Sequence, residues 1–191
     1  YQSIVPVAGE QDEPIEAASV GDTGATVQQD TGGDVAANTY QDGYVSIRDE
    51  TGQGQLLLVY SHGSLTNAAE TEITFVDPIL VALHADATAD LIRNPYREVI
   101  IHPSPNTARI VGLMVRVLTA SYYGWLQTEG MASVLTDGTV VIGQHVRASD
   151  AVNGAVEALD RDGTAEDEQE VGTVVGVSAN TEYSLIHLTL E

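Results

Sequence analysis

Residues 131–143 read MASVLTDGTVVIG, and this stretch indicates the fold class more clearly than any other part of the chain. Two runs of strand-forming residues flank Asp137 and Gly138. An Asp-Gly pair favours the positive backbone angles that a two-residue hairpin turn needs. We therefore predict a β-hairpin that turns at Asp137 and Gly138.

The rest of the chain repeats this pattern of short apolar runs separated by turn-forming residues. Apolar side chains recur mostly at every second position, which is typical of strands. Strands are expected at 44–48, 55–60, 71–76, 98–102, 171–177 and 183–190. Two segments, 86–94 and 149–159, are expected to form short helices, the second capped by Ser149 or Asp150. The prediction is an all-β protein of small barrel-like or sandwich-like units, with short antiparallel strands, tight turns and one or two short helices.

The 191 residues are enough for two small domains. We place an N-terminal β region at 25–105 and a C-terminal β domain at 106–191. Residues 1–24 are acidic and lack strand alternation, so we expect an extended N-terminal arm that a neighbouring molecule orders. Within this arm, Ile4, Val5 and Val7 could add a short strand to an exposed sheet edge.

The charge of the chain is extreme, with 28 acidic residues against 7 basic ones and a net charge of −21. All seven basic residues are arginine, and lysine is absent. Molar salt shortens the screening length to roughly 3 Å, so this composition suits a salt-loving host. Acidic surfaces repel phosphate backbones and anionic lipids, and we therefore expect neither nucleic acid nor membranes as partners. No apolar run spans a membrane, and the first ten residues lack signal-peptide features.

Several classes of enzyme are excluded by composition. The chain has no cysteine for a thiolate and no lysine for a phosphate loop or a Schiff base. Two Asp-Thr-Gly triplets, 22–24 and 30–32, lie too close together to come from the two lobes of an aspartic protease. The five histidines lack the spacing of a zinc helix. We expect no enzymatic activity and no cofactor.

The segment DRDGTAEDEQE, residues 160–170, resembles a calcium loop only locally. With Gly163 at the sixth position of such a loop, Ala158 would be first and Gln169 twelfth, where Asp and Glu are needed. A solvated loop is the favoured interpretation. A weak cation site formed by Asp160, Asp162 and Glu168 is the alternative.

The only tryptophan, Trp125, lies near Tyr122 and Tyr123. On a regular strand Tyr122 and Trp125 would face opposite sides, so one is expected in the core and the other at a contact with a neighbouring subunit. The alternative is that all three aromatic side chains belong to the core.

Two stretches of the C-terminal half resemble the capsid decoration, or cement, proteins of tailed viruses. They are GWLQTEGMASVLTDGTVVIGQHVRASDAVNGAVEAL and VGTVVGVSANTEYSLIHLTLE. The resemblance extends upstream through DETGQGQLLLVYSH, FVDPILVALHAD and NPYREVIIHPSPNTARIVG, and so runs from about residue 40 to the end of the chain. No single motif is a signature, and the ordered series carries the likeness.

The resemblance implies a structural virion protein on the outer surface of an assembled capsid. Its partners would be the major capsid protein and further copies of itself, as a trimer, and its role would be to stabilise the shell. Tyr122, Tyr123 and Trp125 would lie near a subunit or capsid contact. The excess of acidic residues indicates that the host of such a virus would be a haloarchaeon or a similar salt-loving organism. Two alternatives stay open: a carbohydrate-binding or adhesion module that uses aromatic residues beside Gln127 and Asn153, or a turret or tail protein of the same virion.

Overall fold

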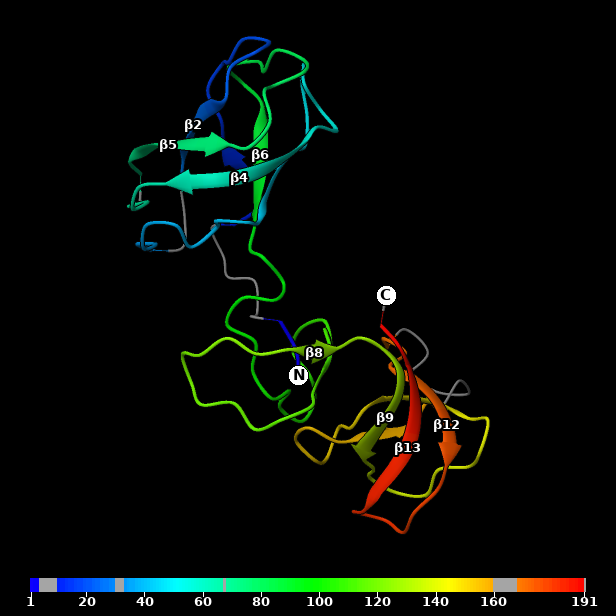
Figure 1. Cartoon of the computed structure of the whole chain (residues 1–191). Helices are drawn as coiled ribbons and strands as arrows, with labels where there is room; N and C mark the ends of the chain where they lie inside the picture. Colours follow the sequence, from blue (N-terminus) through cyan, green and yellow to red (C-terminus); the bar gives the residue numbers. More distant parts are fainter. Residues whose placement is uncertain (4–9, 30–32, 67, 160–167, 191) are drawn as a thin grey trace. The chain divides into compact units, whose positions relative to one another are not determined.

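The computed structural model describes residues 1–3, 10–29, 33–66, 68–159 and 168–190. Within these ranges the chain is all β, with thirteen strands and no helix. None of the described residues therefore forms a helix that could cross a membrane. The chain divides into two compact units, Pro6–Pro95 and Tyr1–Val5 together with Tyr96–Glu191. Figure 1 shows the strands of each unit.

The N-terminal unit is built on a curled antiparallel sheet in the order β1-β6-β3-β4-β5-β2. A bridge between Ile15 and Val27 connects the chain after β1 to β2, so the two edges of the sheet meet. The six strands are β1 (Glu13–Pro14), β2 (Gly24–Gln28), β3 (Tyr44–Ile47), β4 (Leu56–His62), β5 (Glu70–Phe75) and β6 (Thr88–Ile92).

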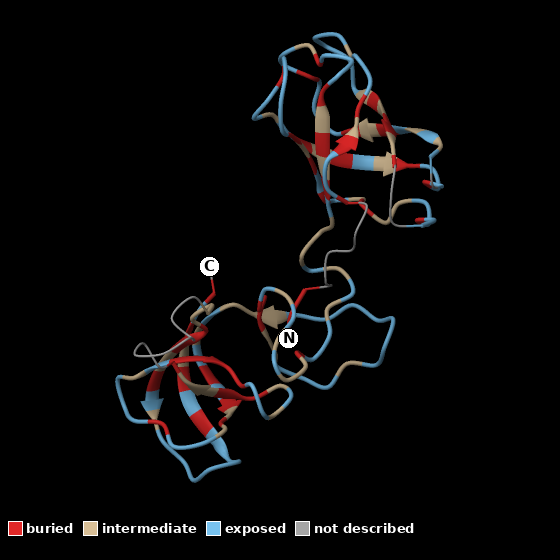
Figure 2. Ribbon diagram, turned by 180° about the vertical axis from the view of Figure 1, so that it is seen from behind, coloured by how far each residue is buried: buried red, intermediate tan, exposed pale blue. Residues whose placement is uncertain are grey.

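The core of this unit follows from the period-two pattern of its strands. Alternate side chains face inward, so Val45 and Ile47 of β3 and Ile73 and Phe75 of β5 are buried. Figure 2 shows this alternation as red and paler segments along each strand. Tyr40 is fully buried beside these strands.

The C-terminal unit contains a second antiparallel sheet, in the order β11-β10-β12-β13-β9, and a separate two-stranded ribbon, β7-β8. A parallel bridge from Thr136 to Val156 connects the end of β9 to β11. The strands are β7 (Leu113–Met114), β8 (Leu126–Gln127), β9 (Glu129–Leu135), β10 (His145–Ala148), β11 (Val156–Ala158), β12 (Gly172–Gly176) and β13 (Tyr183–Thr189).

Strand β9 lies at an edge of this sheet and pairs with β13. Its inward side chains, Ala132 and Val134, join the buried cluster of this unit. The side-chain amide of Gln127 donates to the backbone oxygens of Glu129 (3.0 Å) and Met131 (2.9 Å). These bonds occupy acceptors that a further strand would otherwise use.

The predicted hairpin at Asp137 and Gly138 is wrong. Gly138 has the expected positive φ of 76°, but β9 pairs with β13 and not with the residues that follow the turn. The Asp137 N–H donates to the Val156 oxygen, so the chain crosses toward β11. The local turn chemistry is present, but long-range pairing determines the partner of β9.

Both predicted helices are also wrong. Segment 86–94 contains β6, in which Ala89 and Leu91 are buried on one face as a strand requires. In segment 149–159, the Ser149 hydroxyl does accept the N–H groups of Ala151 (3.1 Å) and Val152 (3.0 Å), as an N-cap would. No helical turn follows, because Gly154 has a positive φ of 76° and the chain continues into β11.

The N-terminal residues also differ from the expected arm over 1–24. Gln2 is buried and bridges both Ile100 and Ile110 of the C-terminal unit. Residues 13–14 form β1, and Ile15 is 1% exposed in the core of the N-terminal unit. The division between the units falls after Pro95, where we expected it near residue 105. Of the expected strand at 98–102, only the bridge at Ile100 forms.

Candidate interaction surface

The candidate site is the loop of residues 115–125, which we call the aromatic loop. It connects β7 to β8, and the ribbon is held by the antiparallel pairs Leu113 with Gln127 and Met114 with Leu126. Gly112 precedes the ribbon, and a Cβ there would lie only 2.8 Å from the Cβ of Leu126. A side chain at this position would therefore push the two strands apart.

The loop has internal structure of its own. The Tyr122 N–H donates to the Thr119 oxygen at 3.2 Å, and Ser121 between them has a positive φ of 67°. Gly124 lies close to the side chains of Leu118 and Met114. Leu118 therefore anchors the loop on the ribbon while its neighbours are free to face solvent.

The most unusual property of the aromatic loop is its exposure. Trp125 is 87% exposed and Tyr122 is 71% exposed, and the side chains of Val117 and Tyr123 are fully exposed. Figure 2 shows most of this loop in pale blue. Apolar side chains gathered on one surface are typical of a site that another molecule covers.

A surface groove of about 930 Å³ adjoins the loop. Five aromatic side chains line it, which is half of the ten aromatic residues in the chain. They are Tyr1, Tyr96, Tyr122, Tyr123 and Trp125. Aromatic residues are enriched at interfaces because they bury a large area with few rotatable bonds.

The charge of the surrounding segment differs from that of the rest of the chain. Residues 99–128 contain no Asp or Glu, although the chain has 28 of them. Two exposed arginines, Arg109 and Arg116, lie in this segment. Neither makes an ion pair with a carboxylate of the described residues, whereas Arg48, Arg93 and Arg147 each do. The loop itself therefore carries one arginine and no carboxylate, although Arg97 and Glu98 also line the groove beside it.

The structure brings Tyr122, Tyr123 and Trp125 together on this loop. They do not lie on a strand, and none of them is in the core. Ile4, Val5 and Val7 lie outside the described residues, as do Asp160 and Asp162 of the cation candidate. The sequence prediction missed Val117, Arg109 and Arg116, and the acid-free run from 99 to 128 is the signal that could have found them.

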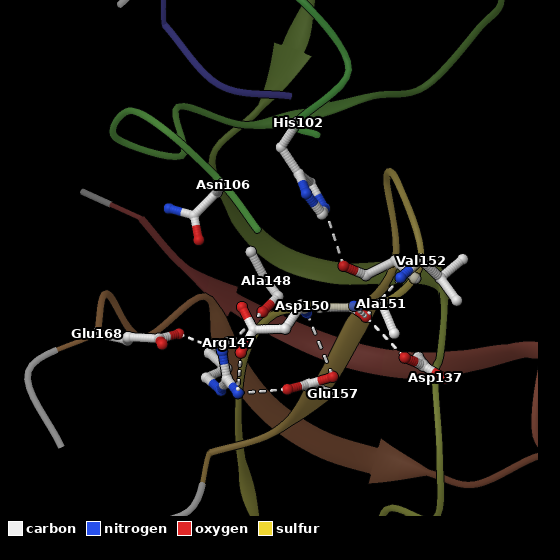
Figure 3. A network of polar contacts seen from close by, with 12 residues as sticks. His102, Asn106, Asp137, Arg147, Ala148, Asp150, Ala151, Val152, Glu157 and Glu168 are labelled. Atoms are coloured by element: carbon white, nitrogen blue, oxygen red, sulfur yellow. Dashed lines mark hydrogen bonds and ion pairs between the residues drawn. The ribbon is translucent and has the colours of Figure 1, made fainter. Parts of the chain in front are cut away.

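The remaining member of the cation candidate, Glu168, is an ion-pair partner of Arg147. The guanidinium of Arg147 also contacts Asp150 at 2.8 Å and Glu157 at 2.5 Å. Figure 3 shows the arginine among these carboxylates. The hydrogen bond to Asp150 is the main cause that raises the pKa of Arg147, and the same bond lowers the pKa of Asp150. This cluster connects β10 and β11 to the chain before β12.

A second polar cluster lies inside the N-terminal unit. The carboxylate of Glu10 accepts hydrogen bonds from the Tyr40 hydroxyl (3.2 Å) and from Arg93. Burial raises the pKa of Tyr40, and the negative charge of Glu10 adds to the effect. The ring of His62 accepts the Tyr40 N–H through Nε2 at 3.0 Å, so Nδ1 carries the proton and donates to Gly63. These groups are engaged in structural hydrogen bonds within the core.

Among the described residues, one histidine of the C-terminal unit borders a small cavity. In the C-terminal unit, an apolar cavity of about 30 Å³ has room for little more than one water molecule. His102 borders it, but both ring nitrogens lie against backbone oxygens, of Pro103 at 3.0 Å and Ala155 at 2.9 Å. Among the residues that the structure describes, no group of three His, Asp or Glu side chains is arranged to hold a metal ion.

Comparison with known proteins identifies no relative. No protein-family model matches the chain, and searches of the curated proteins and of the solved structures find no significant match. The aromatic loop is therefore interpreted from its own geometry and charge.

Proposed function

We propose that this chain is a structural virion protein that binds the outer surface of an assembled tailed-virus capsid and stabilises the shell. The observation that carries the proposal is the exposed aromatic loop on an acid-free segment of an acidic protein. The resemblance of residues 40–191 to decoration proteins supplies the class of partner. In this proposal the two curled sheets form small barrel-like units, and the aromatic loop makes the capsid contact.

The physical conditions of a salt-loving host favour this arrangement. Molar salt screens the repulsion between an acidic protein and an acidic capsid, because the screening length falls to roughly 3 Å. Burial of apolar surface retains its strength under those conditions. A contact made by Val117, Tyr122, Tyr123 and Trp125 therefore suits a saline environment.

Binding to particles tests the proposal. Virions of the virus that encodes the chain are stripped of it, and the purified protein is added back in high salt. We expect the wild-type chain to sediment with the particles and the triple variant Tyr122→Ala, Tyr123→Ala, Trp125→Ala to stay in solution. Tyr60→Ala is the matched control, since Tyr60 is 61% exposed on the N-terminal unit. A wild-type chain that does not bind particles would contradict the proposal.

A homo-oligomer is part of the proposal, and a trimer is the expected form. Capsids of this type offer threefold and quasi-threefold positions, and a symmetric oligomer would place three aromatic loops on them at once. Light scattering in high salt measures the mass of the free protein. A strictly monomeric chain, both free and on particles, would remove this part of the proposal.

Carbohydrate binding is the second candidate function. The groove beside Tyr96, Tyr122 and Trp125 favours it, because sugars stack on exposed aromatic rings. Glycan arrays probed in high salt with the wild-type and Trp125→Ala chains distinguish this function from capsid binding. A turret or tail position on the same virion is distinguished by imaging of intact particles.

A further inference from the structure

Arg116 lies within the aromatic loop, between the exposed side chains of Val115 and Val117. Its guanidinium makes no hydrogen bond or ion pair with any residue that the structure describes. Other arginines of this chain do form ion pairs with nearby carboxylates. Arg48 lies 3.3 Å from Asp90, and Arg147 contacts three carboxylates.

Carboxylates outnumber basic residues fourfold in this protein, so an arginine without one requires an explanation. The explanation is local, since residues 99–128 contain no Asp or Glu. An exposed guanidinium without a partner in its own chain has all five N–H donors available to another molecule. Its planar geometry matches a carboxylate and can bind it through two parallel hydrogen bonds.

We infer that the aromatic loop docks on an acidic patch of the major capsid protein, with Arg116 paired to a carboxylate of that protein. This inference rests on the proposed function and adds the chemistry of the partner. Charge complementarity carries it, because the loop presents an exposed arginine and no carboxylate of its own to an acidic surface. The exposed side chains of Val115 and Val117, which flank Arg116 in the sequence, would be buried in the same contact and would help to exclude water from the ion pair.

A second copy of this chain is the competing partner, because its acidic surface could also supply a carboxylate to Arg116. A contact between the loop of one copy and an acidic face of another would be heterologous, and it closes into a ring only if the rotation between copies fits. The capsid is the occupant that we favour, and the experiment below distinguishes the two.

The absence of lysine makes a direct test possible. Arg116→Lys retains the positive charge and introduces the only lysine of the chain. A carbodiimide then joins that amine to a carboxylate in direct contact with it, and mass spectrometry identifies the joined peptides. Gln53→Lys is the matched control, because Gln53 is an exposed residue of the N-terminal unit. Any coupling through the N-terminal amine occurs equally in both variants.

We expect the Arg116→Lys chain, bound to stripped particles, to couple to an Asp or Glu of the major capsid protein, and the Gln53→Lys chain not to do so. Particles that bind the chain without this product would overturn the inference while leaving the proposed function intact. Coupling of Arg116→Lys to a second copy, with and without particles, would assign the surface to self-association and also overturn it. Failure of the wild-type chain to bind particles would refute the proposed function itself.

Salt dependence supplies an independent measurement. Relative to wild type, Arg116→Gln should weaken particle binding about tenfold at about 0.5 M salt, and by less at about 3 M, where ion pairs are screened. Trp125→Ala should weaken binding at both concentrations. Gln53→Glu changes the net charge by the same amount as Arg116→Gln and serves as the control. Equal effects of Arg116→Gln and Gln53→Glu would show a general charge effect and overturn the inference.

Discussion

Because lysine is absent, every ion pair that a basic side chain forms in this protein is formed by an arginine or a histidine. Arg147 is the most constrained of them, with a side chain that is 9% exposed and surrounded by three carboxylates. Arginine suits this position because its five donors can satisfy several acceptors at once, whereas a lysine ammonium has three. Arg93 plays a comparable part for buried Glu10 in the N-terminal unit.

Replacement of Arg147 should destabilise the C-terminal unit strongly. In Arg147→Gln the carboxylates of Asp150, Glu157 and Glu168 lose their common partner, and because they are partly exposed we expect a loss of about 1–3 kcal/mol in the free energy of unfolding. Arg109→Gln is the control and should change stability by less than about 0.5 kcal/mol, because Arg109 is exposed. Urea unfolding at neutral pH measures both. Equal stability of the two variants would contradict the structural role of Arg147.

The ion pair between Arg147 and Asp150 predicts that the stability of the C-terminal unit depends on pH. Arg147 holds the pKa of Asp150 below its ordinary value, so the ionised form is favoured in the folded state. The contribution of Asp150 to stability is therefore fully present above the unfolded pKa of about 3.9 and is lost as pH falls through the lowered folded pKa. The stability gap between wild type and Arg147→Gln should narrow below about pH 4. A gap that widens in acid would contradict this assignment.

At the scale of elements, the sheets depend on residues that alternate between core and solvent. In β13, Ser184, Ile186 and Leu188 are buried, while Tyr183 and Leu185 are exposed. Strand β13 is an interior strand of the C-terminal sheet, because it pairs with β12 on one side and with β9 on the other. Its inward residues should therefore determine the stability of the whole C-terminal sheet.

Neighbouring residues of β13 should respond differently to truncation. Ile186→Ala removes a fully buried side chain and should cost about 2–5 kcal/mol. Leu185→Ala removes a side chain that is 42% exposed and should cost less than about 1 kcal/mol. Thermal melting of the two variants checks the alternation. A larger loss for Leu185→Ala would mean that the faces of the strand are assigned the wrong way round.

Sequence reasoning predicted the all-β class and most of the longer strands, because their side chains alternate clearly. It failed at β6, where Ala89 and Leu91 alternate as in a strand although a short helix was predicted over 86–94. It failed at Asp137 and Gly138 because a turn signal does not specify which strand pairs across it. Tyr122, Tyr123 and Trp125 were singled out from the sequence, but their exposure depends on the irregular loop after β7, which local sequence does not encode.

At the scale of the whole molecule, two hydrophobic clusters of buried residues belong to separate units, and both lie beneath a strongly acidic surface. A net charge of −21 opposes compaction through mutual repulsion. Since lysine is absent and several arginines are already paired, dissolved cations must supply most of the compensation.

Stability should therefore rise with salt. We expect the melting temperature of the wild-type chain to increase from tens of millimolar to several molar salt, as the repulsion is screened. Calorimetry across a salt series measures this. A sugar such as sucrose at matched water activity serves as the control for effects that do not involve charge. A melting temperature that is constant across the series would contradict a role for charge repulsion.

Deletion of residues 1–24 should disrupt the N-terminal unit. The deletion removes β1, which pairs with β6, and Ile15, which is buried in the core. The deleted chain should lose the melting transition of this unit, as followed by circular dichroism. A truncated chain that retains the stability of the N-terminal unit would restore the idea of a separate arm.

The amide of Gln127 has a consequence for the solubility of the protein. It covers the backbone oxygens of Glu129 and Met131 at the outer edge of β9, and by alternation the backbone groups of Ser133 and Leu135 face the same way. Among the described residues, nothing else is bonded along this side. Gln127→Ala would uncover the outer edge of β9, where Glu129 is the one charged side chain among the exposed residues 129, 131 and 133 of the strand. Concentrated preparations of that variant should slowly form intermolecular sheets that bind thioflavin, while the wild-type protein stays clear.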